Sequence, residues 1–288
     1  MKKLTVSLVF LFLAVSLFSF DWPVKHIIVT STFGESRGDH FHTGIDLGGG
    51  AQTVYPISDG EVIFEHTSGQ YSSIPIGLGN FVVLQHKGNI RSIYCHLKDN
   101  SIKVGTSVLR NEKLGVIGDT GHSFGKHLHL SIIDLETHSI LNPLSLLPQV
   151  PDSQPPIIKN VFLKIGDKIE KVSHIKNVKP SRAQILVETY DLREDVSFIW
   201  KLAPYVIILY ENGAELGRIT FNSITEHTGK LVLNGTDKSF NDVYKSDWTY
   251  KLNFIELLEG ENHFLIVVKD FAGNETMRDY FVKIGKVK

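Results

Sequence analysis

The sequence predicts an all-β protein in which an antiparallel β-sheet domain is followed by a smaller β-sandwich. Residues 24–148 consist of short apolar runs separated by glycine, and several of these runs alternate between apolar and polar side chains. No stretch keeps the 3.6-residue apolar period of an amphipathic helix. A proline-rich segment then separates this pattern from a second series of strand-like runs.

Residues 1–20 have the composition of an export signal. Two lysines near the start are followed by no charge until Asp21, and residues 4–20 are apolar but slightly short of the about 20 residues that span a bilayer. We expect either a cleaved signal peptide or an uncleaved signal anchor. Both place the protein in the periplasm or cell envelope, and only the anchor would bring it into contact with a membrane.

The composition excludes several classes of function. Without residues 1–20 the chain has 28 basic and 31 acidic side chains, a net charge of −3, which argues against a nucleic-acid partner. Neither a phosphate-binding glycine loop nor a Gly-x-Ser-x-Gly elbow is present. The single cysteine, Cys95, cannot form an internal disulfide. Because its side chain would point away from that of His96 in a strand, we expect a buried apolar role for it.

The first domain, residues 21–150, is predicted to be built from three strand–turn–strand segments. These are residues 54–66, 80–97 and 113–135, and the segment 80–97 alternates well on both sides of a Lys-Gly-Asn turn. Residues 142–150, which contain two prolines, would close the domain.

A linker at residues 151–157 is predicted to lead into a second domain, residues 158–288. Proline and small polar side chains in the linker cannot continue a sheet. Two hairpins stand out beyond it: residues 206–221, with Asn-Gly at the turn, and residues 263–284, with Ala-Gly-Asn near the bend. Short strands at this spacing indicate a small sandwich. Only three of the 13 histidines lie in this domain, so we expect the chemistry in the first one.

Three short segments of the first domain carry side chains that can bind a metal. They are His-Thr-Gly-Ile-Asp at 42–46, Tyr-Cys-His at 94–96 and His-Leu-His at 127–129. In an extended chain, side chains at positions i, i+2 and i+4 emerge from one face. His42 would therefore lie beside Asp46 if that segment is a strand, and the two histidines of the third segment would share a face.

A catalytic zinc ion needs about three protein ligands and one open position for water. His42 and Asp46 supply one nitrogen and one oxygen, and either His127 or His129 supplies the third ligand. The other histidine of that pair is then left near the metal together with His96. A nearby unliganded group of this kind can move a proton or stabilise a developing oxyanion.

The chain resembles the lysostaphin/LytM-type zinc metallopeptidases, whose signatures are His-x-x-x-Asp and His-x-His. The resemblance extends over about residues 30–147 in unbroken order. It includes STFGESRGDHFHTGIDL, VYPISDG, GNFVVLQHKGNIRSIYCHL and VGTSVLRNEKLGVIGDTGHSFGKHLHL.

This resemblance implies specific roles for five residues. His42, Asp46 and His129 become the metal ligands and would hold one Zn²⁺ per chain. His96 and His127 become the unliganded catalytic pair, which would orient or deprotonate water and stabilise the tetrahedral intermediate. The sequence does not distinguish which of the two is the general base.

The chain departs from the family pattern in two places. Leu130 and Ser131 follow the His-x-His motif, where the family usually has phenylalanine and glutamate. The glutamate could have held a metal ligand in its orientation through a contact that does not involve the metal. Loss of such a contact can weaken a metal site. Residues 66–79 also form a longer connection than a tight turn, so we expect a different rim on the cleft.

The function that the resemblance implies is an exported zinc metalloendopeptidase that hydrolyses peptide crosslinks in bacterial peptidoglycan during cell-wall remodelling. Its partners would be the stem peptides or crosslinks of the wall. Two alternatives remain: a non-catalytic activator or scaffold of other cell-wall hydrolases, and a zinc peptidase directed at proteins. Retention of every predicted ligand argues against the first alternative.

The remaining expectations concern the groove and the second domain. Arg37 would either hold a substrate carboxylate or form a surface salt bridge, and His40 and His122 would lie near the cleft. Residues 158–288 resemble bacterial immunoglobulin-like or fibronectin type III-like modules, but only in strand pattern and in the Asp-Phe-Ala-Gly-Asn-Glu bend. A role as spacer or docking module is expected for them.

Overall fold

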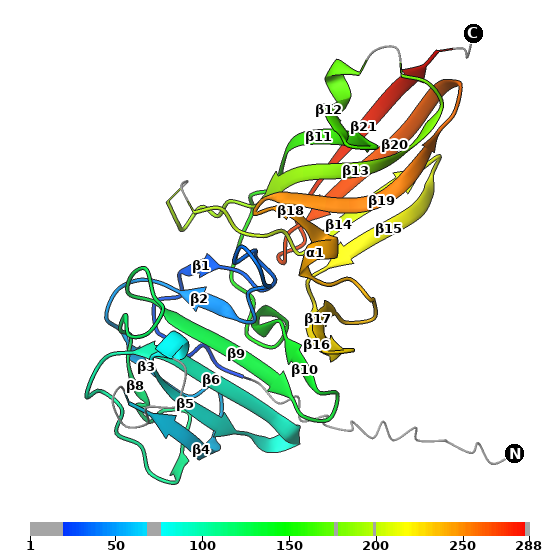
Figure 1. Cartoon of the computed structure of the whole chain (residues 1–288). Coiled ribbons are helices and arrows are strands. Elements are labelled where there is room, and N and C mark those ends of the chain that lie inside the picture. Colours follow the sequence, from blue (N-terminus) through cyan, green and yellow to red (C-terminus); the bar gives the residue numbers. More distant parts are fainter. Residues whose placement is uncertain (1–19, 68–75, 176–177, 198–199, 286–288) are drawn as a thin grey trace, which may run out of the picture.

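The computed structural model describes residues 20–67, 76–175, 178–197 and 200–285, and it is almost entirely β (Figure 1). All strand pairings within these residues are antiparallel, which confirms the predicted fold class. Most of the predicted export signal lies outside the described residues. Among the described residues, no helix has the length and apolar character that a membrane span requires.

The larger sheet has ten strands in the order β17-β16-β10-β9-β6-β5-β4-β7, and β2 pairs with both β1 and β9. Its strands are β1 (Val29–Ser31), β2 (Ile45–Leu47), β4 (Gly60–His66), β5 (Asn80–Gln85), β6 (Ile90–Leu97), β7 (Ser107–Val108), β9 (Leu128–Asp134), β10 (Ser139–Leu141), β16 (Ser223–His227) and β17 (Lys230–Leu233). A separate two-stranded sheet joins β3 (Thr53–Val54) to β8 (Gly115–Val116). Three short 3₁₀ helices accompany these strands: η1 (Ile76–Leu78), η2 (Lys87–Asn89) and η3 (Pro143–Ser145).

The predicted strand–turn–strand segments of the first domain form with one difference in pairing. Residues 80–97 make the hairpin β5–β6, closed by η2. In the other two segments the two strands do not pair with each other, because β3 from one segment pairs with β8 from the other. Strand alternation therefore located the strands, but the partners of these short strands depend on contacts between distant segments.

Most of the C-terminal half forms a sandwich of two sheets, in the orders β12-β11-β13-β19-β18 and β15-β14-β20-β21. Its elements are β11 (Ile157–Ile165), β12 (Lys168–Lys171), η4 (Val172–His174), β13 (Ser181–Tyr190), β14 (Val206–Glu211), β15 (Ala214–Thr220), the short helix α1 (Phe240–Val243), β18 (Tyr244–Ser246), β19 (Thr249–Leu257), β20 (Gly260–Lys269) and β21 (Glu275–Ile284). Both predicted hairpins are present. At the turn between β14 and β15, Asn212 and Gly213 have φ values of 49° and 83°, as a type I′ turn requires.

One hairpin of the C-terminal half belongs to the sheet of the N-terminal half. β16 pairs with β10, with Ile140 opposite Ile224, and β17 forms the edge beyond it. Figure 1 shows this hairpin beside β10, below the sandwich. We still propose residues 151–157 as the boundary between two domains. However, β10 before this boundary and β16 after it belong to one continuous sheet.

Each half has its own apolar core, and the second core extends into the first half. The core of the N-terminal half includes Ile45, Leu84, Tyr94 and Leu128, all of them completely buried. The core of the sandwich also contains Phe33, and likewise Phe41, which comes from the segment just before β2. The segment that leads into the first predicted metal motif is therefore held by the sandwich.

Candidate metal centre

Strand register brings the separated motifs together. β2, β9 and β6 are neighbours, and Asp46 on β2 lies directly opposite His129 on β9. His129 in turn lies opposite Cys95 on β6, so His96 is one residue away from that pair. Side chains at directly opposed positions of an antiparallel pair have Cβ atoms about 5 Å apart. The sheet thus places residues that are more than 80 positions apart in the sequence around one point.

The three predicted metal ligands meet in the structure. His42 Nε2 lies 3.1 Å from Asp46 Oδ1 and 2.9 Å from His129 Nδ1, and His129 Nδ1 lies 3.0 Å from Asp46 Oδ1. Tetrahedral zinc with bonds of about 2.0–2.1 Å requires donor atoms about 3.3 Å apart. The set therefore fits a single zinc ion with only a small adjustment.

In each of the two predicted ligand histidines, the ring nitrogen that faces away from the cluster donates a hydrogen bond. His42 Nδ1 donates to the carbonyl of Thr32 at 2.8 Å. His129 Nε2 donates to Ser131 Oγ at 2.8 Å, because that hydroxyl gives its own proton to the carbonyl of Thr43. In the neutral rings His42 Nε2 and His129 Nδ1 must then carry lone pairs. Two lone pairs and a carboxylate oxygen converge with no proton between them, an arrangement that suits a cation.

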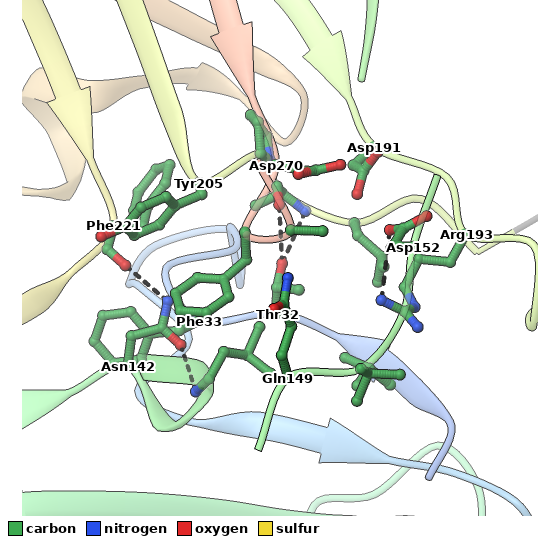
Figure 2. A pocket seen from close by; sticks show the side chains of 18 of the residues that line it. Thr32, Phe33, Asn142, Gln149, Asp152, Asp191, Arg193, Tyr205, Phe221 and Asp270 are labelled. Carbon is green, nitrogen blue, oxygen red and sulfur yellow. Dashed lines mark hydrogen bonds and ion pairs between the residues drawn. The ribbon is translucent and has the colours of Figure 1, made fainter. Parts of the chain in front are cut away.

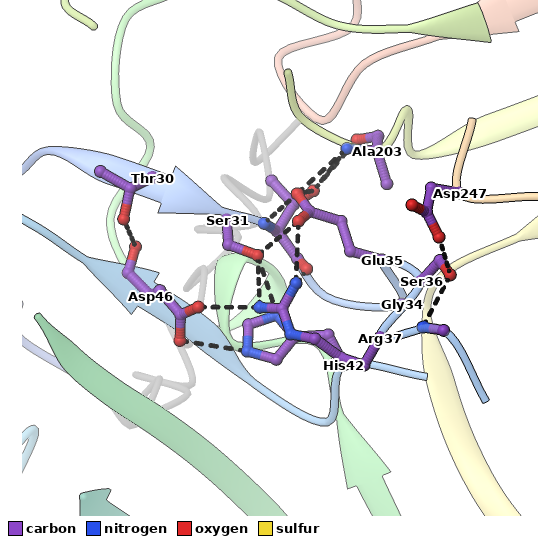
Figure 3. Close-up of polar contacts among 12 residues, drawn as sticks. Thr30, Ser31, Gly34, Glu35, Ser36, Arg37, His42, Asp46, Ala203 and Asp247 are labelled. Atoms are coloured by element: carbon purple, nitrogen blue, oxygen red, sulfur yellow. Dashed lines mark hydrogen bonds and ion pairs between the residues drawn. The ribbon is translucent and has the colours of Figure 1, made fainter. Parts of the chain in front are cut away.

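The second oxygen of Asp46 is held by a charged network that reaches the sandwich. Arg37 donates to Asp46 Oδ2 at 2.8 Å and to Ser31 Oγ at 2.7 Å (Figure 3). The buried Glu35 accepts from Ser31 Oγ and from the backbone N–H of Ala203, which belongs to the C-terminal half. Arg37 therefore makes a salt bridge with a predicted ligand, and the chain beyond the linker supports that network.

The two predicted unliganded histidines lie next to this cluster. His127 Nε2 is 3.8 Å from Asp46 Oδ1, and the rings of His96 and His127 have centroids 4.7 Å apart. His96 Nδ1 donates to the carbonyl of Thr120, and His127 Nδ1 to the carbonyl of Gly125, each at 2.8 Å. In their neutral forms both rings therefore carry the lone pair on Nε2.

His96 has a backbone conformation that its sequence position does not reveal. Its φ is 61°, in the left-handed region that side-chain-bearing residues rarely adopt. Such strain costs on the order of 1 kcal/mol and is often found at functional sites. It turns a residue at the end of β6 out of the regular alternation, so the even spacing of the strand does not decide where this ring points.

Burial sets the protonation of the cluster. It is the main reason that the pKa of His96 is lowered to about 4, against the opposing effect of the Thr120 carbonyl. Burial also lowers the pKa of His129. Burial would raise the pKa of Asp46, but the neighbouring His42 and His129 favour its ionised form and hold the pKa well below its ordinary value. Neutral imidazoles beside a carboxylate are the forms that bind metal.

The cluster opens into a groove of about 1280 Å³. His40 and His122, which the sequence places near the motifs, both line this groove. The groove is lined by residues of the N-terminal half and by a wall from the C-terminal half, which consists of Asp195, Val196, Ser197, Trp200, Lys201 and Trp248. Trp200 in that wall is about half exposed. A long open groove with aromatic side chains on one wall can accommodate an extended polymer.

Ser131 makes the supporting contact with His129 that we expected to be missing. The usual glutamate is absent two residues after His129, but Ser131 Oγ contacts the ring of that histidine directly. Sequence reasoning missed this, as it missed the contacts of Glu35. Cys95 is buried as expected, and burial raises the pKa of its thiol. The long connection at residues 66–79 lies largely outside the described residues.

Comparisons with known proteins find sequence similarity in the N-terminal half of the chain. Residues 40–143 match peptidase family M23, and a second family model that carries no description matches residues 155–285. The DD-carboxypeptidase/endopeptidase Mpg of Neisseria meningitidis is 36% identical over 113 residues, which are 37% of this chain and 24% of Mpg. The peptidoglycan DD-endopeptidase ShyA of Vibrio cholerae is 34% identical over 93 residues, 32% of this chain and 20% of ShyA.

A solved structure of a zinc-containing peptidase from Vibrio cholerae matches with 26% identity and a TM-score of 0.37, covering 46% of this chain and 41% of that one. An uncharacterised metalloprotease of Buchnera aphidicola is 34% identical over 92 residues, 32% of this chain and 23% of that protein. The chain spans about a quarter or less of the length of these curated relatives.

Proposed function

We propose that the protein is a zinc metalloendopeptidase that hydrolyses peptide crosslinks in bacterial peptidoglycan, because residues 40–143 match peptidase family M23. We further propose that it is exported and acts in the periplasm or cell envelope, as residues 1–20 suggest. Relatives that share the domain are named as peptidoglycan endopeptidases, which supports this class of substrate.

The observation that carries the proposal is the convergence of three lone-pair donors beside two further histidines at the base of an open groove. A wall-binding protein without activity could use the groove but has no need for the convergent metal-binding donors. The donor atoms of His42, Asp46 and His129 converge as a metal site would require, and His96 and His127 lie beside them with Nε2 available. This argues against the alternative of a non-catalytic activator.

The chain's own residues would divide the work of hydrolysis. Zinc held by the three ligands would supply the Lewis acid that makes water nucleophilic and polarises the peptide carbonyl. His96 and His127 are fixed through Nδ1, so Nε2 of either ring can accept a proton from the attacking water. Once protonated, the same atom can donate a hydrogen bond to the developing oxyanion or a proton to the leaving amine.

Substitution of a ligand tests the proposal. For His129→Ala we expect loss of bound zinc and a decrease of about 100-fold or more in the release of fragments from isolated wall sacculi, since the Lewis acid contributes several kcal/mol. His263→Ala, which removes a histidine of the sandwich that pairs with Asp279, is the matched control and should retain both properties.

Unchanged cleavage by His129→Ala would refute the metal assignment. Zinc binding without fragment release by the wild-type protein would instead favour the activator. Cleavage of a glycine-rich protein in preference to the sacculi would favour a protein-directed peptidase.

A further inference from the structure

Three acidic side chains meet at the junction of the linker and the sandwich, far from the metal centre in sequence. Asp152 belongs to the linker, Asp191 directly follows β13, and Asp270 directly follows β20. One carboxylate oxygen of each lies within 4.8 Å of the others. Figure 2 shows the three carboxylates grouped at one end of a pocket between the two halves of the protein.

All three carboxylates are removed from solvent. Asp191 is 5% exposed and Asp270 is 3% exposed, and the side chain of Asp152 is also 3% exposed. Asp191 Oδ1 has no hydrogen-bond partner among the residues that the structure describes. A buried carboxylate oxygen without a partner is rare in folded proteins, because the loss of its hydration costs about 1–3 kcal/mol or more.

Each oxygen of the other two carboxylates has a partner, but Arg193 is the one charged partner that the described residues supply, and Asp152 Oδ1 accepts only the backbone N–H of Gln154. Asp270 Oδ1 accepts the backbone N–H groups of Gly273 and Asn274, and its Oδ2 accepts from the Asn274 side chain. Arg193 lies 3.4 Å from Asp152 Oδ2, but this arginine also pairs with Asp195. The positive charge of one guanidinium group is therefore not enough to balance three buried carboxylates.

The excess of buried carboxylates also affects the pKa of Asp191. Burial is the main cause that raises its pKa to about 8, and the neighbouring charges of Asp270 and Asp152 add to it. A divalent cation would remove both the repulsion and the unmet hydrogen-bonding capacity.

We propose that Asp152, Asp191 and Asp270 form a calcium site that fastens the linker to the ends of β13 and β20. The donors are all oxygens, which a hard cation prefers over zinc's usual nitrogen and sulfur ligands. Ca²⁺ forms bonds of 2.3–2.6 Å in irregular geometry, so two ligands of one ion can lie as far as about 5 Å apart. Mg²⁺ needs shorter bonds and stricter octahedral geometry, and fits this set less well.

The pocket leaves room for the ion and its remaining ligands. Its volume of about 40 Å³ exceeds the about 10–15 Å³ that one water molecule requires. Asp191 is followed closely in the chain by Asp195, Val196 and Ser197, which belong to the wall of the large groove. An ion at Asp191 would therefore stiffen the start of that wall, and the site does not depend on the proposed peptidase activity.

The test uses the full chain, stripped with chelator and then given one equivalent of zinc so that the histidine centre is filled. Calorimetric titration with calcium chloride should show one Ca²⁺ per chain with a Kd of about 10⁻⁴–10⁻³ M, the range of extracellular modules. At ten times the Kd, the Tm should rise by about 3 °C. Magnesium chloride should bind at least about tenfold more weakly.

Two variants and a control locate the site. Asp191→Asn keeps the size of the side chain and cannot become negatively charged, so it should fold; we expect it to lose at least about tenfold in calcium affinity. Asp152→Asn, which lies on the linker, should also bind calcium more weakly. Asp167→Asn, at the exposed turn between β11 and β12, should bind calcium as the wild type does. Absence of binding at about 10 mM calcium, or equal binding by Asp191→Asn and wild type, would overturn the proposal.

Discussion

Each histidine of the metal centre has one ring nitrogen committed to a neighbouring oxygen. The acceptor is a backbone carbonyl for His42, His96 and His127, and the hydroxyl of Ser131 for His129. These contacts select the tautomer, and the tautomer would decide which nitrogen faces a bound ion. The same type of side chain can therefore serve as ligand in two places and as proton carrier in two others.

Arg37 illustrates how a neighbour of a proposed ligand would affect a bound metal. Its guanidinium holds Asp46 Oδ2, but it would also bring a positive charge near the cation. Because the side chain is about one-third exposed, solvent screens the repulsion, and the loss of orientation should dominate. We expect Arg37→Ala to lower zinc affinity about tenfold or more in competition with a chromogenic chelator.

The control for this prediction is Arg110→Ala, which removes an exposed arginine that pairs with Asp21 on the other side of the domain. It should bind zinc as tightly as the wild type. Tighter binding by Arg37→Ala would mean that charge repulsion outweighs orientation.

The buried His96 predicts how stability depends on pH in the metal-free protein. Its pKa is about 4 in the folded state and about 6.5 in the unfolded chain, so between these values only the unfolded chain binds the proton. Stability from this group is complete above pH 6.5 and decreases as the pH falls towards 4. We expect His96 alone to contribute a loss of about 2 kcal/mol in unfolding free energy between pH 7 and pH 5.

Urea denaturation of the chelator-treated protein at both pH values measures this loss. His96→Gln lacks the titrating group and should lose correspondingly less, whereas His263→Gln should follow the wild type. Equal losses of unfolding free energy for the wild type and His96→Gln would show that the ring is already protonated in the folded state or that it titrates normally.

Much of the site could be predicted from the sequence, because its residues lie in short motifs with even spacing. His42, Asp46 and the His127–His129 pair are of that kind, and the structure brings them together as expected. The positive φ of His96 could not be predicted, since it depends on where Thr120 lies in the fold. Similarly, Ser131 and Glu35 act through contacts with distant segments that no local pattern encodes.

At the scale of elements, hairpins were predictable and sheet order was not. The turns of β5–β6 and β14–β15 have glycine at positions with positive φ, a strictly local signal. The pairing of β3 with β8 and of β10 with β16 joins segments that are about 60 and 80 residues apart. Such pairs are decided by the packing of whole layers, so alternation alone locates the strands but not their neighbours.

At the scale of the whole molecule, the two halves are connected by more than a linker. Tyr244 donates to the carbonyl of Gly34, and Asn142 donates to the carbonyl of Phe221. The ring of Phe221 lies directly over Gly34, where even a Cβ atom would come within 2.1 Å of it. Because Gly34 and Glu35 lie on the segment between β1 and His42, the sandwich helps to fix the geometry of the metal centre.

This arrangement predicts that damage at the junction destabilises both halves. Phe221→Ala empties a completely buried site and should lower the unfolding free energy by about 3–5 kcal/mol. If the halves unfold together, amide-exchange protection should decrease by a similar factor in β6 and in β13, although neither strand contains Phe221. Phe281→Ala, an exposed position on β21, is the control and should change stability by less than about 1 kcal/mol. Loss of protection in β13 with β6 unchanged would show that the first domain folds independently, and that its metal centre needs no support from the sandwich.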